Sequence, residues 1–198
     1  MKKYSLSVYV LMMAICSFCG WLVENIWLLF TKGFIDNRSM HYPFLLGYGL
    51  FIMTVYFVLG TPSTIHIKIK NSKLKDSSTR FLTYLIIMMF VIGVGEIFMG
   101  YTVEHFCHFE YWNYTAVPLH LTKYTSLPTS LGFALIATVV MEKLIIPIMN
   151  LLSTIPLGIR NTLAIILLTI MVGDFLYSFY RMYTDQGLYI RWRIYIFS

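Results

Sequence analysis

The sequence predicts an all-α membrane protein with about five transmembrane helices, built as a duplicated helix-loop-helix unit plus a fifth helix. Of its 198 residues, 58% are hydrophobic and only 12% are charged, whereas soluble domains have about 25% charged residues. A bilayer is crossed by ~20 apolar residues, and five apolar runs are near or above this length. They lie at 6–30, 43–60, 81–106, 127–152 and 159–180. Because the runs are continuous rather than alternating, they favour helices over a membrane barrel.

A repeated pattern supports the duplication. The stretch GWLVEN at 20–25 is echoed by GYTVEH at 100–105, each at the far end of an apolar run. A loop and a second shared phrase follow, PFLLGYGL at 43–50 against PTSLGFAL at 128–135, which pairs Tyr48 with Phe133. Matches in the same order favour duplication over chance. The chain then divides into a first hairpin at 1–60, a basic linker at 61–80, a second hairpin at 81–152, and a fifth helix with an interfacial tail at 153–198.

Basic residues are distributed unevenly among the predicted loops. Cytoplasmic loops of membrane proteins are enriched in Lys and Arg, and five such residues lie in the linker. Lys2 and Lys3 precede the first helix, and Arg160 follows the fourth. We therefore expect a multi-pass protein of the cell membrane with a cytoplasmic N-terminus and external loops at 31–42 and 107–126. This pattern explains the net charge of +6, so no nucleic-acid partner is expected.

Four acidic residues inside the predicted helices are candidates for substrate binding or coupling: Glu24, Glu96, Glu104 and Asp174. Acids within a bilayer are costly, face the bundle interior, and mark substrate or ion pathways. A structural role is the alternative, with Asn25 or a backbone group as the partner of Glu24. In the third helix, a stripe of small and acidic residues on one face cannot be turned to lipid. Its members are Gly93, Glu96, Gly100 and Glu104.

Three of these acids lie in the outer third of helices that run outward in this topology. We expect Glu24, Glu104 and Asp174 to approach one another there. Three ionised carboxylates would repel, so the prediction requires either a cationic partner or a protonated acid. The cationic candidates are His105, His108 and Arg38.

The two external loops add further candidates. Arg38 presents five donors in a planar fork that suits a carboxylate or phosphate, and a salt bridge to Asp36 is the alternative. Trp112 lies in an aromatic run that fits either membrane anchoring or stacking on a ligand. Glu104 and His108 are four residues apart and form a weak metal half-site, against which a hydrogen-bonded helix end is preferred. We therefore expect no metal and no cofactor.

Several short motifs resemble a known family of small bacterial membrane proteins. The motifs are GWLVE at 20–24, Asn37-Arg38, Tyr48-Gly49, WNYT at 112–115 and Ser130-Leu131. They resemble the CmpB-like family, described as putative type IV ABC-transporter permeases, which shows G-W-x-x-E, N-R-G leading to P-x-Y-G, and W-D-Y-S. The likeness covers most of 6–152. Here Ser39 replaces the loop glycine, the loop is one residue short, Leu46-Gly47 replaces P-x, and Asn113 replaces the aspartate.

The resemblance implies an integral membrane transport protein, a permease-like subunit. No G-x-x-x-x-G-K-[ST] motif occurs, so ATP hydrolysis would need a separate ATPase subunit. A self-contained, proton-coupled carrier is the alternative within transport. A membrane-embedded enzyme acting on lipid head groups, with Glu24 or Glu104 as acid or base, and a non-catalytic accessory subunit are the other classes. No nucleophile is evident, so an enzyme is less expected. Membrane lipid is an expected partner, and a homo-oligomer stays open.

Overall fold

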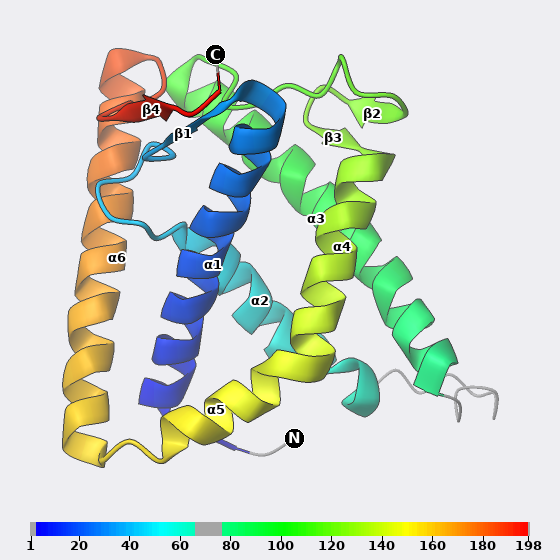
Figure 1. Ribbon diagram of the computed structural model, residues 1–198, viewed down its shortest axis with the longest axis vertical. Coiled ribbons are helices and arrows are strands. Elements are labelled where there is room, and N and C mark those ends of the chain that lie inside the picture. Colours follow the sequence, from blue (N-terminus) through cyan, green and yellow to red (C-terminus); the bar gives the residue numbers. More distant parts are fainter. Residues whose placement is uncertain (1–2, 66–76, 198) are drawn as a thin grey trace. The chain divides into compact units, whose positions relative to one another are not determined.

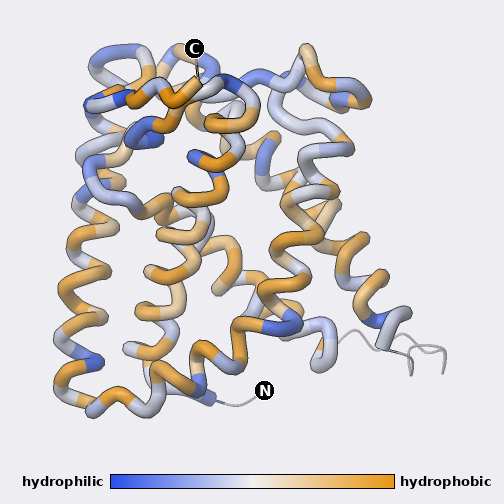
Figure 2. The backbone as a smooth tube through the Cα atoms, in the orientation of Figure 1, coloured by the Kyte–Doolittle hydropathy of each residue, from blue (hydrophilic) through white to orange (hydrophobic). Residues whose placement is uncertain are grey.

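The computed structural model describes residues 3–65 and 77–197 of the chain. Five helical spans in it are long and apolar enough to cross a membrane, which confirms the predicted fold class. They cover Leu6–Lys32, Leu46–Thr64, Ser77–Cys107, Leu127–Ser153 and Leu157–Asp185. Figure 2 shows that the helix bodies are mostly hydrophobic and that hydrophilic residues gather toward the helix ends and in the loops. The chain is therefore a multi-pass membrane protein.

The described elements follow one another in a simple order. The helices are α1 (Leu6–Lys32), α2 (Leu46–Leu59), α3 (Ser77–Cys107), α4 (Leu127–Val139), α5 (Ile145–Ser153) and α6 (Leu157–Asp185). A 3₁₀ turn, η1 (Pro62–Thr64), follows α2, and a π-helical turn, η3 (Val140–Leu144), separates α4 from α5. Four short strands complete the fold: β1 (Phe34–Asp36), β2 (His120–Thr122), β3 (Thr125–Ser126) and β4 (Arg193–Tyr195).

The predicted second span, 43–60, starts at Pro43, but α2 begins only at Leu46. The Phe44 N–H donates to the Tyr42 carbonyl at 2.8 Å, so the chain makes a tight turn at Pro43 before the helix starts. The Leu45 N–H donates to the carbonyl of Ser17 at 3.0 Å, which holds the approach to α2 against α1.

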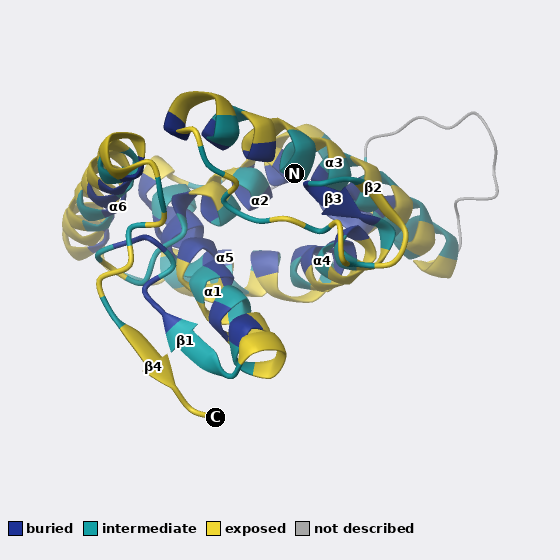
Figure 3. Cartoon of the chain, turned by 90° about the horizontal axis from the view of Figure 1, so that it is seen from above, coloured by how far each residue is buried: buried dark blue, intermediate teal, exposed yellow. Residues whose placement is uncertain are grey.

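The chain folds as two compact units, one of residues 2–54 with 147–198 and one of residues 55–146. In the first, which we call the split unit, α6 packs along α1 (Figure 1). At one end of these helices β1 pairs antiparallel with β4, with Phe34 opposite Tyr195 and Asp36 opposite Arg193. Figure 3 shows β4 exposed and β1 more buried. The C-terminal tail is thus an integral part of the split unit.

In the second, which we call the continuous unit, α3 packs against α4 and the β2–β3 ribbon joins them. Near the start of α3, Tyr84 donates its hydroxyl to the carbonyl of Gly60 at 2.9 Å. The side chain of Ser126 caps α4 by accepting from the Thr129 N–H. These contacts fix the two helices that carry the continuous unit's acids and hydroxyls.

Candidate functional site

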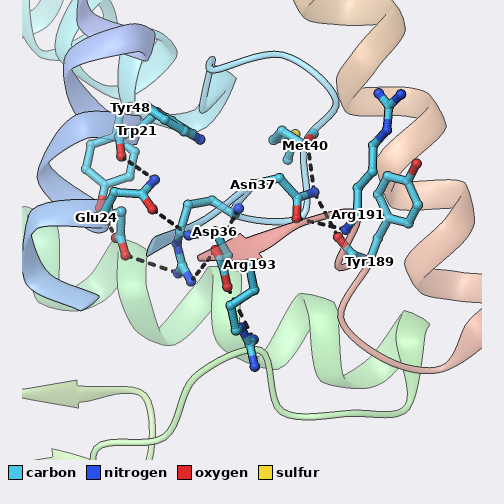
Figure 4. Close-up of polar contacts among 11 residues, drawn as sticks. Trp21, Glu24, Asp36, Asn37, Met40, Tyr48, Tyr189, Arg191 and Arg193 are labelled. Atoms are coloured by element: carbon cyan, nitrogen blue, oxygen red, sulfur yellow. Dashed lines mark hydrogen bonds and ion pairs between the residues drawn. The ribbon is translucent and has the colours of Figure 1, made fainter. Parts of the chain in front are cut away.

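Glu24 has a hydrogen-bond donor on each carboxylate oxygen (Figure 4). Tyr48, in the first turn of α2, donates its hydroxyl to Oε1. Arg38, in the loop after β1, donates from Nη2 to Oε2 at 3.1 Å. The Tyr48 ring also covers Gly20, one turn before Glu24, so closely that a Cβ at that position would overlap it. The missing side chain of Gly20 is therefore what lets Tyr48 reach Glu24.

The loop around Arg38 is bent into an unusual conformation. Both Arg38 and Ser39 have positive φ angles, 50° and 58°, which cost energy for residues with a side chain. The bend is held because the Arg38 N–H donates to Asp36 Oδ1 at 2.9 Å and the Asp36 N–H donates to Asn25 Oδ1 at 2.8 Å. Asn25, which the sequence offered as a partner of Glu24, thus positions the loop instead.

Asp36 belongs to a cluster of acidic and basic side chains at this loop whose charges balance. Its side chain is 2% exposed, and it accepts from Arg193 at 3.3 Å while Arg38 Nη1 lies 3.8 Å away. A buried carboxylate is tolerated only when it is paired and hydrogen-bonded. Two carboxylates, of Glu24 and Asp36, therefore face two guanidinium groups, of Arg38 and Arg193. The salt bridge of Arg38 to Asp36 that the sequence suggested is present, and Arg38 also pairs with Glu24. Binding of a ligand carboxylate or phosphate by Arg38 stays a prediction.

The C-terminal tail fastens the same loop at Asn37 (Figure 4). The Asn37 side-chain amide donates to the carbonyls of Met40 at 2.9 Å and Tyr189 at 3.0 Å. Its oxygen accepts the Arg191 N–H at 3.0 Å. With every amide position used, Asn37 is a structural link between loop and tail.

Asp174 holds the far end of the loop. Its two oxygens accept the N–H groups of His41 and Tyr42, each at 2.8 Å, and Ser178 donates to it at 3.2 Å. Glu24 and Asp174 thus bind the two ends of one loop. The predicted approach of both to Glu104, which belongs to the continuous unit, stays a prediction.

Glu104 in the continuous unit has a matching set of partners. Tyr124 donates its hydroxyl to Oε2 at 2.8 Å, and Lys123 donates to Oε1 at 2.6 Å. The Tyr124 ring covers Gly100, one turn before Glu104, and a Cβ at Gly100 would overlap it. Lys123 also donates to Glu110 at 2.9 Å, outside the helix.

These contacts shift the pKa values of the groups just outside α3. Hydrogen bonds to Glu104 and then to Glu110 raise the pKa of Lys123 above its ordinary value. Hydrogen bonds from Lys123 and then from Asn113 lower the pKa of Glu110. Burial, with the hydrogen bond to Glu104, raises the pKa of Tyr124 to about 12. At neutral pH, Lys123 is therefore charged and Tyr124 is a neutral donor.

Trp112 contacts Tyr124 directly. Its Nε1 donates to the Tyr124 carbonyl at 2.9 Å, and the two rings meet edge to face with centroids 5.7 Å apart. Stacking of Trp112 on a ligand stays a prediction.

Glu96 lies two turns before Glu104 on α3 and binds hydroxyl groups. Thr125 and Ser130 donate to Oε2 at 2.6 and 3.1 Å, and their hydroxyls lie 2.9 Å apart. A Cβ at Gly93 would be in ordinary contact with the same two hydroxyls. The segment from Tyr124 to Ser130 therefore covers the stripe of small and acidic residues on α3.

His108 lies directly after α3 with φ 58°, and its N–H donates to the Glu104 carbonyl at 2.9 Å. The two residues thus share a backbone hydrogen bond at the helix end. In residues 3–65 and 77–197, no group of three or more His, Cys, Asp and Glu side chains could hold a metal ion.

Sequence reasoning missed three of the residues that bind these acids. The repeated pattern paired Tyr48 with Phe133. In the structure, however, the residue that binds Glu104 as Tyr48 binds Glu24 is Tyr124. Lys123 was not among the cations proposed for the acids, although it is the single Lys or Arg in the loop 107–126. That isolated charge was the available signal. Tyr124 has no such signal, because its contact with Gly100 depends on how the loop folds back.

Comparison with protein families gives a match over most of the chain. The family model described as "Putative ABC-transporter type IV" matches residues 11–179. This range includes Glu24 and Glu104 with their tyrosine and cation partners, but not Arg193. No curated protein and no solved structure shows a significant match.

Proposed function

Because the chain belongs to the family described as putative ABC-transporter type IV, we propose that it is the permease-like membrane subunit of a transporter whose ATPase is a separate chain. Five helices that are long and apolar enough to cross a bilayer support a role within the membrane. The sequence has no phosphate-binding loop, so nucleotide hydrolysis falls to the partner.

The observation that carries the proposal is a carboxylate–tyrosine–cation arrangement that occurs twice. In each unit a glycine and a glutamate one turn apart meet one tyrosine, and a loop cation binds the second carboxylate oxygen. This likeness supports the predicted duplication. The two copies of this arrangement differ in spacing, which the predicted repeat does not account for. Tyr48 follows Arg38 by ten residues, whereas Tyr124 directly follows Lys123.

The arrangement links loop position to the charge state of a membrane acid. If the first loop moves away, Arg38 leaves and Glu24 keeps only Tyr48, which belongs to α2. If the second loop moves away, Glu104 loses Lys123 together with Tyr124, the next residue of the same loop. An ionised acid that loses its counter-charge in a membrane helix is strongly destabilised, so a proton or a cationic group must replace the loop cation. A ligand that binds the open form better than the closed form would shift this equilibrium. Glu24 and Glu104 are thus the proposed coupling acids, and Arg38 and Lys123 the exchangeable cations.

Three further candidates have supporting roles in this proposal. Asp174 and Trp112 hold the two loops in the closed position through His41, Tyr42 and Tyr124. Glu96 provides a second acid on the covered face of α3, bound by hydroxyl groups. These contacts would be broken or rearranged when the loops open.

The test is nucleotide hydrolysis by the complex that the chain forms. The tagged full chain is crosslinked in its own membranes, purified, and assayed for vanadate-sensitive ATP hydrolysis. We expect such activity with the wild type, and a loss of at least tenfold in Glu24→Gln with Glu104→Gln at unchanged recovery. The control is Asp185→Asn, an exposed carboxylate at the end of α6, which should hydrolyse ATP normally. Absence of hydrolysis from the crosslinked wild-type complex would refute an ATPase partner.

A further inference from the structure

Arg160 is a buried arginine at the end of the split unit opposite the β1–β4 pair. It lies in the first turn of α6 and is 9% exposed. Its Nε donates to Ser7 Oγ at 3.1 Å, and its Nη1 donates to the carbonyl of Ser153 at 3.1 Å. Both partners are neutral oxygens, one on α1 and one at the end of α5.

No carboxylate among the described residues neutralises the charge of Arg160. Ser153 ends α5, and a helix C-terminus supplies at most about half a negative charge. Burying a full charge is costly unless a counter-charge accompanies it. An anion from outside the chain would supply the missing charge.

The surroundings of Arg160 indicate which anion fits. Residues next to Arg160 and its two partners along the chain are large, apolar and exposed: Leu6, Leu151, Leu157 and Ile159. An acidic protein surface would leave these side chains without apolar contacts. A lipid matches both features, since its phosphate is charged and its acyl chains are apolar.

We propose that Arg160 is a binding site for the phosphate of an anionic lipid, with the acyl chains lying on the exposed apolar residues beside it. The position suits a headgroup, because Arg160 is only three residues inside the start of the span Leu157–Asp185. Exposed Lys3, at the same end of α1, adds positive charge. Arginine binds phosphate through two parallel N–H donors, and here Nη2 makes no hydrogen bond to the described residues.

The experiment is thermal unfolding of the purified full chain in a neutral detergent, with phosphatidylglycerol, phosphatidylcholine or inorganic phosphate added. We expect phosphatidylglycerol to raise the wild-type Tm by about 5–10 °C at saturation, well above the effect of either other addition. Arg160→Gln should lose this preference. Arg160→Met provides a second neutral variant in case the glutamine variant does not accumulate. Arg181→Gln, an exposed arginine paired with Asp185 on the same helix, is the control and should keep the full preference.

A purely structural Arg160 gives a different pattern. Its removal would then lower the Tm equally in every condition, and the preference for phosphatidylglycerol would survive in both neutral variants. That result overturns the proposal. Equal stabilisation of the wild type by inorganic phosphate would overturn the lipid as the source of the anion.

Discussion

The Tyr48 ring fills the space that a side chain at Gly20 would occupy, and from there its hydroxyl reaches Glu24 one turn further along α1. Tyr124 stands in the same relation to Gly100 and Glu104. In both units the glycine is a requirement of packing.

Alanine at these glycines should therefore destabilise the protein. Gly20→Ala and Gly100→Ala each place a methyl group inside a tyrosine ring's volume, and overpacking of this kind costs about 1–3 kcal/mol. Gly95→Ala is the matched control on α3, because a Cβ there meets no atom within 4 Å. It should leave stability unchanged or raise it by up to about 1 kcal/mol, since alanine favours helix. Thermal unfolding in detergent measures all three, and equal effects at Gly95 and Gly100 would contradict the packing argument.

The Glu24–Arg38 pair should be coupled more strongly than an exposed pair. Its side chains are 21% and 15% exposed, against 45% and 39% for Asp185 and Arg181. A double-mutant cycle with Glu24→Gln and Arg38→Met should give about 1–2 kcal/mol, because hydrogen bonds to charged groups are strong when shielded from water. The same cycle at Arg181 and Asp185 should give a clearly smaller coupling, because water screens the more exposed pair. Equal coupling in the two cycles would contradict the prediction.

Ser39→Gly should stabilise the split unit by about 1 kcal/mol. Ser39 has φ 58°, which glycine adopts without strain. Its hydroxyl is buried and has no hydrogen-bond partner within the described ranges, so its loss removes an unfavourable group. Ser126→Gly is the control and should destabilise, because Ser126 caps α4 at φ −134°. Equilibrium unfolding compares the two, and a less stable Ser39→Gly variant would show that the hydroxyl is useful.

Glu110 should make stability depend on pH. Lys123 and Asn113 bind its ionised form and lower its pKa, so it stabilises the fold at pH 7. This contribution is present above the ordinary glutamate value of 4.5 and is lost as the pH falls through the lowered pKa. The Tm difference between wild type and Glu110→Gln should accordingly be positive at pH 7 and shrink below pH 4.5. A difference that stays constant with pH would show that the ion pair contributes nothing, as many exposed pairs do.

Membrane orientation is open to cysteine labelling. With the three native cysteines replaced, Lys32→Cys and Ala116→Cys should react with an impermeant maleimide added outside. Both positions are exposed; Lys32 ends α1 and Ala116 follows α3, and both helices are predicted to run outward. Lys3→Cys should react only after the membrane is made permeable. The position Ser72, which lies in the predicted cytoplasmic linker, is outside the described residues. If the external reagent labelled Lys3→Cys alone, the orientation of the chain would be the opposite of the predicted one.

The helices were predictable because hydropathy is a local property of the sequence. Each of the five spans agrees with an apolar run to within five residues at both ends, and the largest difference is at the end of the last span, predicted at 180 and found at Asp185. The start predicted at 43 lies at Leu46, where a loop contact decides the helix start. The acids were also found, since carboxylates in apolar runs are conspicuous in the sequence.

Pairing between distant segments was not predictable in this way. The Asp36–Arg193 contact and the β1–β4 register join residues at opposite ends of the chain. Strands of three residues give no periodic signal, and β4 lies in a tail whose aromatic and basic residues predict an interfacial segment instead. The contact of Tyr124 with Glu104 was not predicted for a related reason, because it depends on how the second loop folds rather than on the repeated sequence pattern.

The pairing of β1 with β4 also sets an order for biosynthesis. The loop after α1 leaves the ribosome early, yet its partners Tyr189, Arg191 and Arg193 are made 152 to 157 residues later. All of the residues 55–146 are synthesised before this, so the continuous unit can fold while translation continues. The split unit cannot close around Asp36 until Arg193 has left the ribosome. A nascent chain stalled before Gly187 would therefore expose this loop, and any early protection of it during synthesis would have to come from the membrane or a chaperone.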